Sequence, residues 1–267
     1  MKQQTNHWRV RLITDPQVLL DYLETDRGYT AYAIGDLEPD LFAQCTWHGA
    51  ETNDHLQALT LCFTGFKPPI LVLVGDPDGL SAILDNDQHP EQAYITCRPG
   101  HLALVRRHYT WENPIAMWRM MLQSEAFEPI AEPAQRLGPE HAEQLQALFA
   151  MGPPNAFHPR QLDGGVFYGR FKDGQVIAVA GTHLVSYSYR VAAVGDVLTH
   201  PDQRRQGHAT AVTNAVVAEL LRQGIQDIVL NVKQANTGAI RIYERLGFAI
   251  HCPFLEGTIT HHSNQRY

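Results

Sequence analysis

The sequence predicts a mixed α/β protein built from two domains, and three observations carry this prediction. The chain has 267 residues, which suits one large domain or two ordinary ones. Short apolar runs typical of strands alternate with amphipathic stretches typical of helices. Residues 125–139 hold three prolines and a glycine among charged side chains, a composition that breaks helices and suits a connection. We therefore expect one domain at residues 1–125 and a second at 126–267.

Composition narrows the class of protein. Hydrophobic residues make up 44% of the chain and charged residues 18%, as in a globular protein with a sizeable core. The formal net charge of -7 argues against a nucleic-acid partner, because phosphate-binding surfaces are usually basic. No apolar run reaches the roughly 20 residues of a membrane span, and the first residues do not resemble a signal peptide. We expect a cytoplasmic protein that has no membrane partner.

The first half reads as alternating helices and strands. The apolar, β-branched run at residues 70–74 is typical of a buried strand. A helix at residues 16–23 follows Asp15, a good N-cap residue. The segment at residues 29–39 is distinctive, but no chemical motif can be assigned to it. The expected strands are 58–63, 70–74, 93–96 and 115–122, and the expected helices are 16–23, 77–84 and 100–108.

The second half has clearer signals for turns and helix ends. Lys172, Asp173 and Gly174 separate two strand-like runs and predict a hairpin turn. Gly247 follows an amphipathic stretch and is a common helix stop. Residues 128–136 could form an extended strand that opens this half. The other expected strands are 166–171, 175–185, 190–199, 227–232 and 248–254, and the expected helices are 139–151, 207–222 and 237–246.

The loop after the strand at residues 190–199 has the chemistry of an anion site. Gly207 and Ala209 open an amphipathic helix, whose first turn has unpaired backbone N–H groups and the positive end of the dipole. Their small side chains allow a phosphate to approach the backbone closely. Arg204 and Arg205 add positive charge beside it. The alternative is an ordinary helix start next to a solvated arginine pair.

A second motif downstream favours the anion site. The sequence N-x-x-A-x-x-x-Y-x-x-x-G-F spans residues 236–248, and the earlier loop fits [Q/R]-x-x-G-x-[G/A]. Together these motifs resemble the GNAT acyltransferase superfamily over about half of the chain. The resemblance implies a GNAT fold, with a mixed, mostly antiparallel central sheet flanked by helices. It also implies acetyl-CoA as the acyl donor. By analogy with two-domain members, residues 1–125 could be a degenerate GNAT-like half that does not bind the donor.

The resemblance assigns roles to individual positions. The strand segment before the loop should pair its backbone with pantetheine, and the loop N–H groups should hold the pyrophosphate. Asn236 should contact the cofactor arm, although it could also cap a helix. Tyr243 should protonate the leaving thiolate, although its spacing from Ile240 and Leu246 also fits a core residue. The implied cofactor-binding residues are Val197, Leu198, Thr199, Arg204, Arg205, Gln206, Gly207, His208, Ala209, Thr210, Asn236 and Tyr243.

The general base is less clear. Some family members carry a glutamate where this chain has Asn231, whose amide cannot take a proton. Asp196, next to the pantetheine segment, is the first choice, and its alternative is a structural hydrogen bond. Glu132, His158 and His183 are the other candidates. Two further histidine positions are given no catalytic role: His200 as a loop residue, and the pair His261–His262 as a solvated tail, not a metal site.

These features predict an N-acetyltransferase that transfers an acetyl group to a primary amine of a small molecule or peptide, by direct attack in a ternary complex. Loops at residues 152–165 and 185–190 should shape the acceptor pocket. No metal is expected, and the sequence leaves a homodimer open. Two alternatives remain. One is a CoA-binding sensor or regulatory protein without catalysis, and the other is transfer of an aminoacyl or longer acyl group on the same fold.

Overall fold

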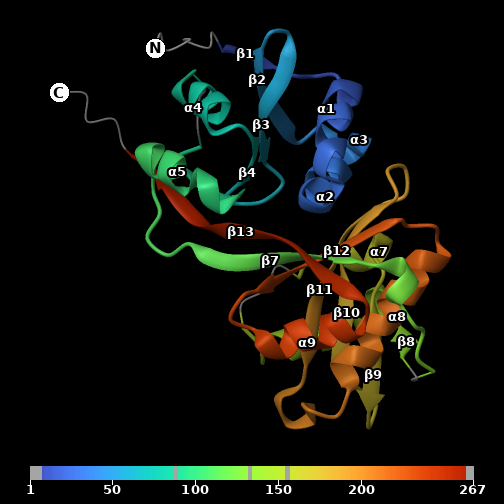
Figure 1. Ribbon diagram of the computed structural model, residues 1–267. Coiled ribbons are helices and arrows are strands. Elements are labelled where there is room, and N and C mark those ends of the chain that lie inside the picture. The colour runs from blue at the N-terminus through green and yellow to red at the C-terminus, as the bar shows by residue number, and fades with distance from the viewer. Residues whose placement is uncertain (1–7, 87–89, 132–133, 154–156, 263–267) are drawn as a thin grey trace. The chain divides into compact units, whose positions relative to one another are not determined.

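The computed structural model describes residues 8–86, 90–131, 134–153 and 157–262. The chain divides into two compact units: unit 1 comprises residues 1–117 and 253–267, and unit 2 comprises residues 118–252. Each unit is a mixed sheet flanked by helices (Figure 1). Most neighbouring strands are antiparallel, whereas β4–β5 in unit 1 and β11–β12 in unit 2 are parallel pairs. The predicted fold class is therefore confirmed.

Unit 1 contains a sheet in the order β1-β2-β3-β4-β5, with the later part of β13 paired to β5. Helices α1–α3 lie on one side of its strands, and α4 and α5 on the other (Figure 1). Its strands are β1 (Arg9–Leu12), β2 (Cys45–Thr52), β3 (His55–Phe63), β4 (Ile70–Gly75), β5 (Gln92–Cys97) and β6 (Tyr109–Thr110). Its helices are α1 (Pro16–Leu23), α2 (Arg27–Gly35), α3 (Pro39–Phe42), α4 (Pro77–Asn86) and α5 (Leu102–His108).

Unit 2 contains a sheet in the order β8-β9-β10-β11-β12, followed by β7. Strands β7 (Ile115–Leu122) and β13 (Phe248–His261) contribute residues to both units. The remaining strands are β8 (Gln135–Arg136), β9 (Tyr168–Lys172), β10 (Gln175–Ser186), β11 (Val191–Thr199) and β12 (Asp227–Lys233). The helices are α6 (Ala142–Phe149), α7 (Gln161–Gly164), α8 (His208–Arg222) and α9 (Thr237–Arg245).

The two units share one order of elements. In each, a short edge strand is followed by helices, a hairpin of two strands and a third antiparallel strand. A helix then leads to a fourth strand that runs parallel to the third, and another helix follows. In this order β4 and β5 of unit 1 correspond to β11 and β12 of unit 2. The fold of unit 1 thus repeats that of unit 2.

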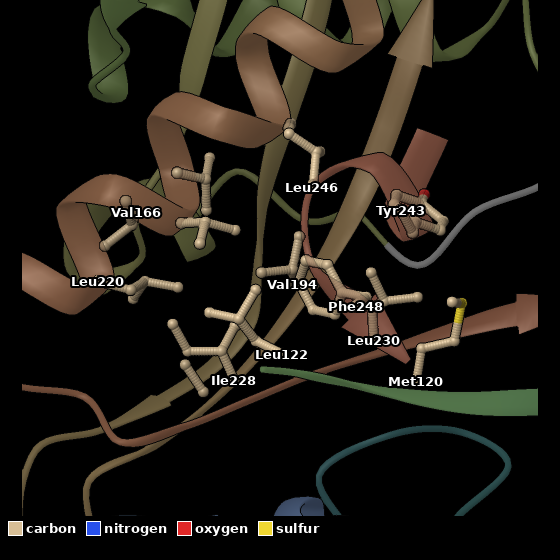
Figure 2. Close-up of a cluster of buried hydrophobic side chains, with 14 of the residues drawn as sticks. Met120, Leu122, Val166, Val194, Leu220, Ile228, Leu230, Tyr243, Leu246 and Phe248 are labelled. Carbon is tan, nitrogen blue, oxygen red and sulfur yellow. The ribbon is translucent and has the colours of Figure 1, made fainter. Parts of the chain in front are cut away.

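Two cores cover opposite faces of the unit 2 sheet. On one face, valine and leucine side chains of α8 pack on Val194, Leu230 and Val232, together with Tyr243 of α9 and its C-cap residue Leu246 (Figure 2). The other core joins α6 and α7 to β10. Because side chains alternate between the faces of a strand, these cores fix which β11 and β12 residues point away from α8 and α9.

Several predicted elements need correction. The expected strand at 128–136 is wrong in extent, since among its described residues only Gln135–Arg136 form a strand. Asn214 of α8 instead bonds the preceding segment, accepting from Ile130 N–H and donating to the Glu128 carbonyl. The last strand is longer than predicted and ends at His261. In the described part of the chain, no helix combines the length and hydropathy of a membrane span.

Candidate functional site

The connection between β11 and α8 is a tight polar turn. His200 follows the last strand residue, Thr199, and its Nδ1 accepts the Asp202 N–H at 3.2 Å, so it lies in the loop as predicted. Pro201 then starts a short 3-10 turn. Arg205 and Gly207 both adopt positive φ angles, 62° and 81°. Left-handed backbone favours glycine, so Gly207 is needed for its conformation as well as for its size.

The N-terminus of α8 is open. Gly207 is its N-cap and offers no side-chain acceptor. Ala211 N–H bonds to the Gly207 carbonyl, so the N–H groups of the preceding first turn have no intrahelical acceptor. A β-carbon built on Gly207 would meet no atom within 4 Å. This helix terminus, with its dipole and the open space at Gly207, fits a pyrophosphate.

The arginine pair flanks this opening. Both side chains belong to exposed residues. Arg204 Nε donates to the Thr199 carbonyl at 3.4 Å, which ties it to the end of β11. The structure therefore brings the predicted loop residues, Arg204 to Thr210, together around one helix terminus.

Unit 1 lacks such an opening at the corresponding helix, α4. Asp76 directly precedes the helix, and its Oδ1 accepts the N–H groups of Asp78 and Gly79 at 2.8 and 3.0 Å. The helix terminus is thus already satisfied by a carboxylate of the chain itself. A second anion would meet this negative charge instead of free N–H groups.

Strands β11 and β12 separate as they approach the loop. Their parallel register runs from Val191↔Asp227 to Val194↔Leu230 and goes no further, although β11 continues to Thr199 and β12 to Lys233. On its other side β11 stays paired, with Leu198 opposite Val179 of β10. The edge of β11 that faces β12 therefore has backbone groups free from Gly195 onward, as the predicted pantetheine segment requires.

Unpaired polar atoms gather where these strands part. Asn231 Oδ1 and Thr199 Oγ1 are buried and have no hydrogen-bond partner among the described residues. The same holds for both carboxylate oxygens of Asp196. Buried polar groups normally find partners, so a cluster of unsatisfied ones marks a place where a ligand can supply them.

Asp196 occupies a β-bulge. Ala180 of β10 faces two β11 residues, Asp196 and Val197, and the φ angle of Asp196 is 51°. The side chain of Asp196 is only 1% exposed. His183 Nε2 lies 3.4 Å from its Oδ1, within ion-pair distance, and the histidine side chain is 32% exposed. The first-choice base and one of its alternatives are thus neighbours, which the sequence did not reveal.

Tyr243 lies in the core that α9 forms with the sheet. Its ring packs edge-on against Phe248, with centroids 6.1 Å apart (Figure 2). Burial raises the pKa of Tyr243 to about 12. Both the core location and the acid role predicted for Tyr243 fit these facts, because a phenol with a raised pKa keeps its proton at neutral pH.

The remaining predicted site residues lie in different surroundings. Asn236 caps α9, its side chain accepting the Ala239 N–H at 3.2 Å. His158 is exposed, and its Nδ1 accepts the Arg160 N–H. Glu132 lies outside the described residues.

The view of His261–His262 as a solvated tail is wrong. His261 belongs to β13, and its ring packs against Tyr109. His262 N–H donates to the His108 carbonyl. Across the described ranges, no group of three or more His, Cys, Asp or Glu side chains could hold a metal ion.

Sequence comparison adds an independent observation. The model of the Acetyltransferase (GNAT) family matches residues 126–248. An Escherichia coli K12 protein named [Ribosomal protein bS18]-alanine N-acetyltransferase is 32% identical over 77 residues, which are 29% of this chain and 50% of that enzyme. The chain spans half or less of the length of the curated relatives that it matches.

Solved structures extend the likeness to the whole fold. A Drosophila protein is similar over 92% of this chain and 97% of its own, with a TM-score of 0.72 and 16% identity. A tandem GNAT protein from the clavulanic acid biosynthesis pathway covers 95% of this chain and 98% of its own, with a TM-score of 0.59 and 12% identity. At these identities the likeness concerns the fold alone. The family match and the open loop at α8 agree, and residues 126–248 of this chain are an acetyltransferase domain of the GNAT family.

Proposed function

We propose that unit 2 transfers an acetyl group from acetyl-CoA to a primary amine of a small molecule or a peptide, by direct attack in a ternary complex. The observation that carries the proposal is the open N-terminus of α8, which directly follows the strand that separates from β12. The open helix terminus suits a pyrophosphate, and the free strand edge suits an extended arm that contains amides. Acetyl-CoA has both groups in this order.

The donor would bind mainly through backbone atoms. The N–H groups of residues 205–210 would hold the pyrophosphate, with the exposed Arg204 and Arg205 beside it. Val197, Leu198 and Thr199 would pair with the pantetheine amides in place of β12. Asn236 is at the N-terminus of α9 and would meet the same arm while it caps the helix. When bound, acetyl-CoA supplies an activated thioester.

Asp196 is the residue that we propose to take the proton of the amine. Its carboxylate is buried, has no hydrogen-bond partner in the described chain, and lies at the separation of the strands. A base there would act where the reacting carbonyl is held by the splayed strands.

Tyr243 is proposed as the acid that protonates the departing thiolate. The raised pKa of its phenol keeps the proton available across the neutral range. It belongs to the core beneath α8 and α9, on the helix that follows β12.

The acceptor class rests on one relative and on one loop. The Escherichia coli relative is named for an alanine of a ribosomal protein, which favours an amine acceptor. Gly152, at the start of one predicted acceptor loop, packs closely on Leu198, since a β-carbon on Gly152 would lie 2.9 Å from that side chain. This loop would therefore border the acceptor side of the pantetheine segment.

Thiol release tests the proposal. Purified protein, acetyl-CoA and a panel of small amines and short peptides with free N-termini are combined, and free CoA is measured with a thiol reagent. At least one amine should stimulate CoA release above hydrolysis, with acetylated amine seen by mass spectrometry. Donor binding with no release from any acceptor would instead favour the sensor alternative. Faster release of CoA from a longer acyl-CoA than from acetyl-CoA would assign the longer acyl group to the enzyme in place of acetyl.

A further inference from the structure

One face of the unit 2 sheet holds a group of polar side chains that the donor does not need. Leu230 and Val232 pack under α8 and α9, so Asn231 between them points to the opposite face. Val194 packs in the same core, so the next residue, Gly195, faces the opposite side of the sheet. Because it is a glycine, no side chain stands there. Gly195 and Asn231 are also the first residues after the last paired position of β11 and β12.

The imidazole of His183 fills the space above Gly195. A β-carbon on Gly195 would lie 2.2 Å from Nε2 and 2.3 Å from Cε1 of His183. Only glycine permits this approach. His183 and Asn231 therefore lie on one face at neighbouring positions, and the Asp196 carboxylate is beside them, 3.4 Å from His183 Nε2.

The unsatisfied atoms of this group are all acceptors. Asp196 contributes Oδ1 and Oδ2, and Asn231 contributes Oδ1. The Asp196 carboxylate is buried and its oxygens accept no hydrogen bond in the described chain, although the His183 imidazole lies within ion-pair distance. Burial of such a group is costly, so its retention points to a ligand that donates hydrogen bonds and carries positive charge. A primary ammonium group has three N–H donors and one positive charge, which matches three acceptor atoms and one carboxylate.

We propose that the acceptor binds here as an alkylammonium ion, with Asp196 and Asn231 accepting its N–H groups and His183 carrying its proton to solvent. The inference rests on the proposed acetyl transfer and assigns the side chains that would hold and deprotonate its charged amine. One N–H bond breaks, and its electron pair becomes the nucleophilic lone pair. The proton bonds first to the Asp196 carboxylate and then to His183 Nε2, whose side chain reaches solvent.

The three residues have different tasks in this scheme. Asp196 and Asn231 touch the amine, but the amide of Asn231 takes no proton and only orients the nitrogen. His183 acts through Asp196.

A binding experiment that needs no turnover tests the site. The side-chain nitrogen resonances of His183 are identified in the full chain by comparison with His183→Asn. They are then followed while n-butylammonium chloride is added, with saturating CoA present. Tetramethylammonium chloride is the matched probe, because it has the same charge but no N–H donor.

Butylammonium should shift the His183 resonances saturably, and tetramethylammonium should not. Asp196→Asn should abolish the shift, and Asn231→Leu should weaken it at least severalfold, so the test does not depend on one variant that fails to fold. Equal shifts from both cations, or a butylammonium shift that survives in folded Asp196→Asn, would overturn the inference. A saturable shift in a protein that releases no CoA would retain the site and overturn the proposed acetyl transfer instead.

A kinetic arm separates proton transfer from a structural role of His183. His183→Ala should lower kcat for a butylamine substrate about a hundredfold, and millimolar imidazole should restore part of it. His55→Ala, an exposed histidine of unit 1, is the control and should keep wild-type turnover. Loss of activity without rescue by imidazole, together with an unchanged resonance shift, would contradict the proton path through His183.

Discussion

His183 Nε2 lies 3.4 Å from Asp196 Oδ1, and each residue sits at an irregularity in the pairing of β10 with β11. The register shifts once opposite Asp196 and again between Thr182 and Leu184, which makes His183 the extra residue on β10. Two successive irregularities thus turn both side chains toward one place. A regular pair of strands would not bring these residues together.

Gly195→Ala should disturb this pair without touching the donor site. The added β-carbon would overlap the imidazole of His183, so the ring must move. We expect kcat to fall about tenfold or more, with unchanged affinity for acetyl-CoA, in steady-state kinetics. Combining Gly195→Ala with His183→Ala should give little additional loss, because both changes remove the same contact. Wild-type turnover in Gly195→Ala would show that the position of His183 is unimportant.

Tyr243→Phe should slow the chemical step. The hydroxyl is the proton donor that we assign to the thiolate, and its raised pKa keeps it protonated. A loss of about a hundredfold in kcat is expected, since general acid catalysis contributes on this order. Phenylalanine retains the ring that packs on Phe248, so thermal unfolding serves as the control. Unchanged turnover in a stable variant would mean that Tyr243 is a core residue only.

Gly207→Ala should weaken donor binding through the backbone alone. A β-carbon there meets no neighbouring atom, but the φ angle of 81° costs an alanine about 1 to 2 kcal/mol. The loop should relax and misplace its N–H groups, raising the Kd for acetyl-CoA about tenfold. Gly100→Ala is the matched control, because its β-carbon is equally unobstructed and its φ is not positive. Equal affinities in the two variants would argue against a preformed loop.

Asp36→Asn should stabilise the protein in a pH-dependent way. Burial raises the pKa of Asp36 to about 7 from an ordinary value of 3.8. The folded state therefore keeps this proton more tightly, and the resulting stability is present below about pH 4 and lost as the pH rises to about 7. Asparagine is never charged, so its advantage over aspartate should grow across this range. Denaturant unfolding at pH 5 and pH 8 measures it.

Asp40→Asn removes the same charged group at an exposed position and is the control for this experiment. If Asp36→Asn behaved in the same way, Asp36 would be ionised equally in the folded and unfolded states.

Much of unit 2 was predictable because its motifs combine local signals. Loop residues, helix starts and glycine stops are each determined by interactions between residues close in sequence. A strand, a helix and a second strand in this order are typical of a parallel strand pair. The strand at residues 128–136 failed because Asn214, which is distant in sequence, bonds the backbone that a partner strand would otherwise have bonded. When a single distant side chain bonds a backbone segment in place of a partner strand, the sequence of that segment shows no alternating pattern.

Helix α2 and strand β2 of unit 1 were missed for related reasons. Helix α2 is buried over most of its length, so it has no polar face and no helical period. In β2, Glu51 is buried because Arg11 of β1 forms an ion pair with it, which only the fold reveals. The segment at residues 29–39 gains a structural role, since Tyr29 donates to the Leu73 carbonyl near the end of β4.

The pairing of His183 with Asp196 had one readable signal. Gly195 interrupts an apolar strand directly before an aspartate, and glycine in a strand often marks a close approach. The identity of the approaching group could not be inferred, because it depends on the register of β10 and its irregularities. The loop before α8 was readable in sequence, whereas the approach of His183 to Asp196 required the paired strands.

Calorimetric titration of the full chain with acetyl-CoA tests the central claim most directly. The account predicts saturable binding of one molecule per chain, because α8 has an open N-terminus whereas Asp76 already caps α4. Gly207→Ala should weaken this binding. Binding at α8 should occur while Asp76 still caps α4. Two equivalent sites, or no heat of binding at millimolar acetyl-CoA, would contradict the account.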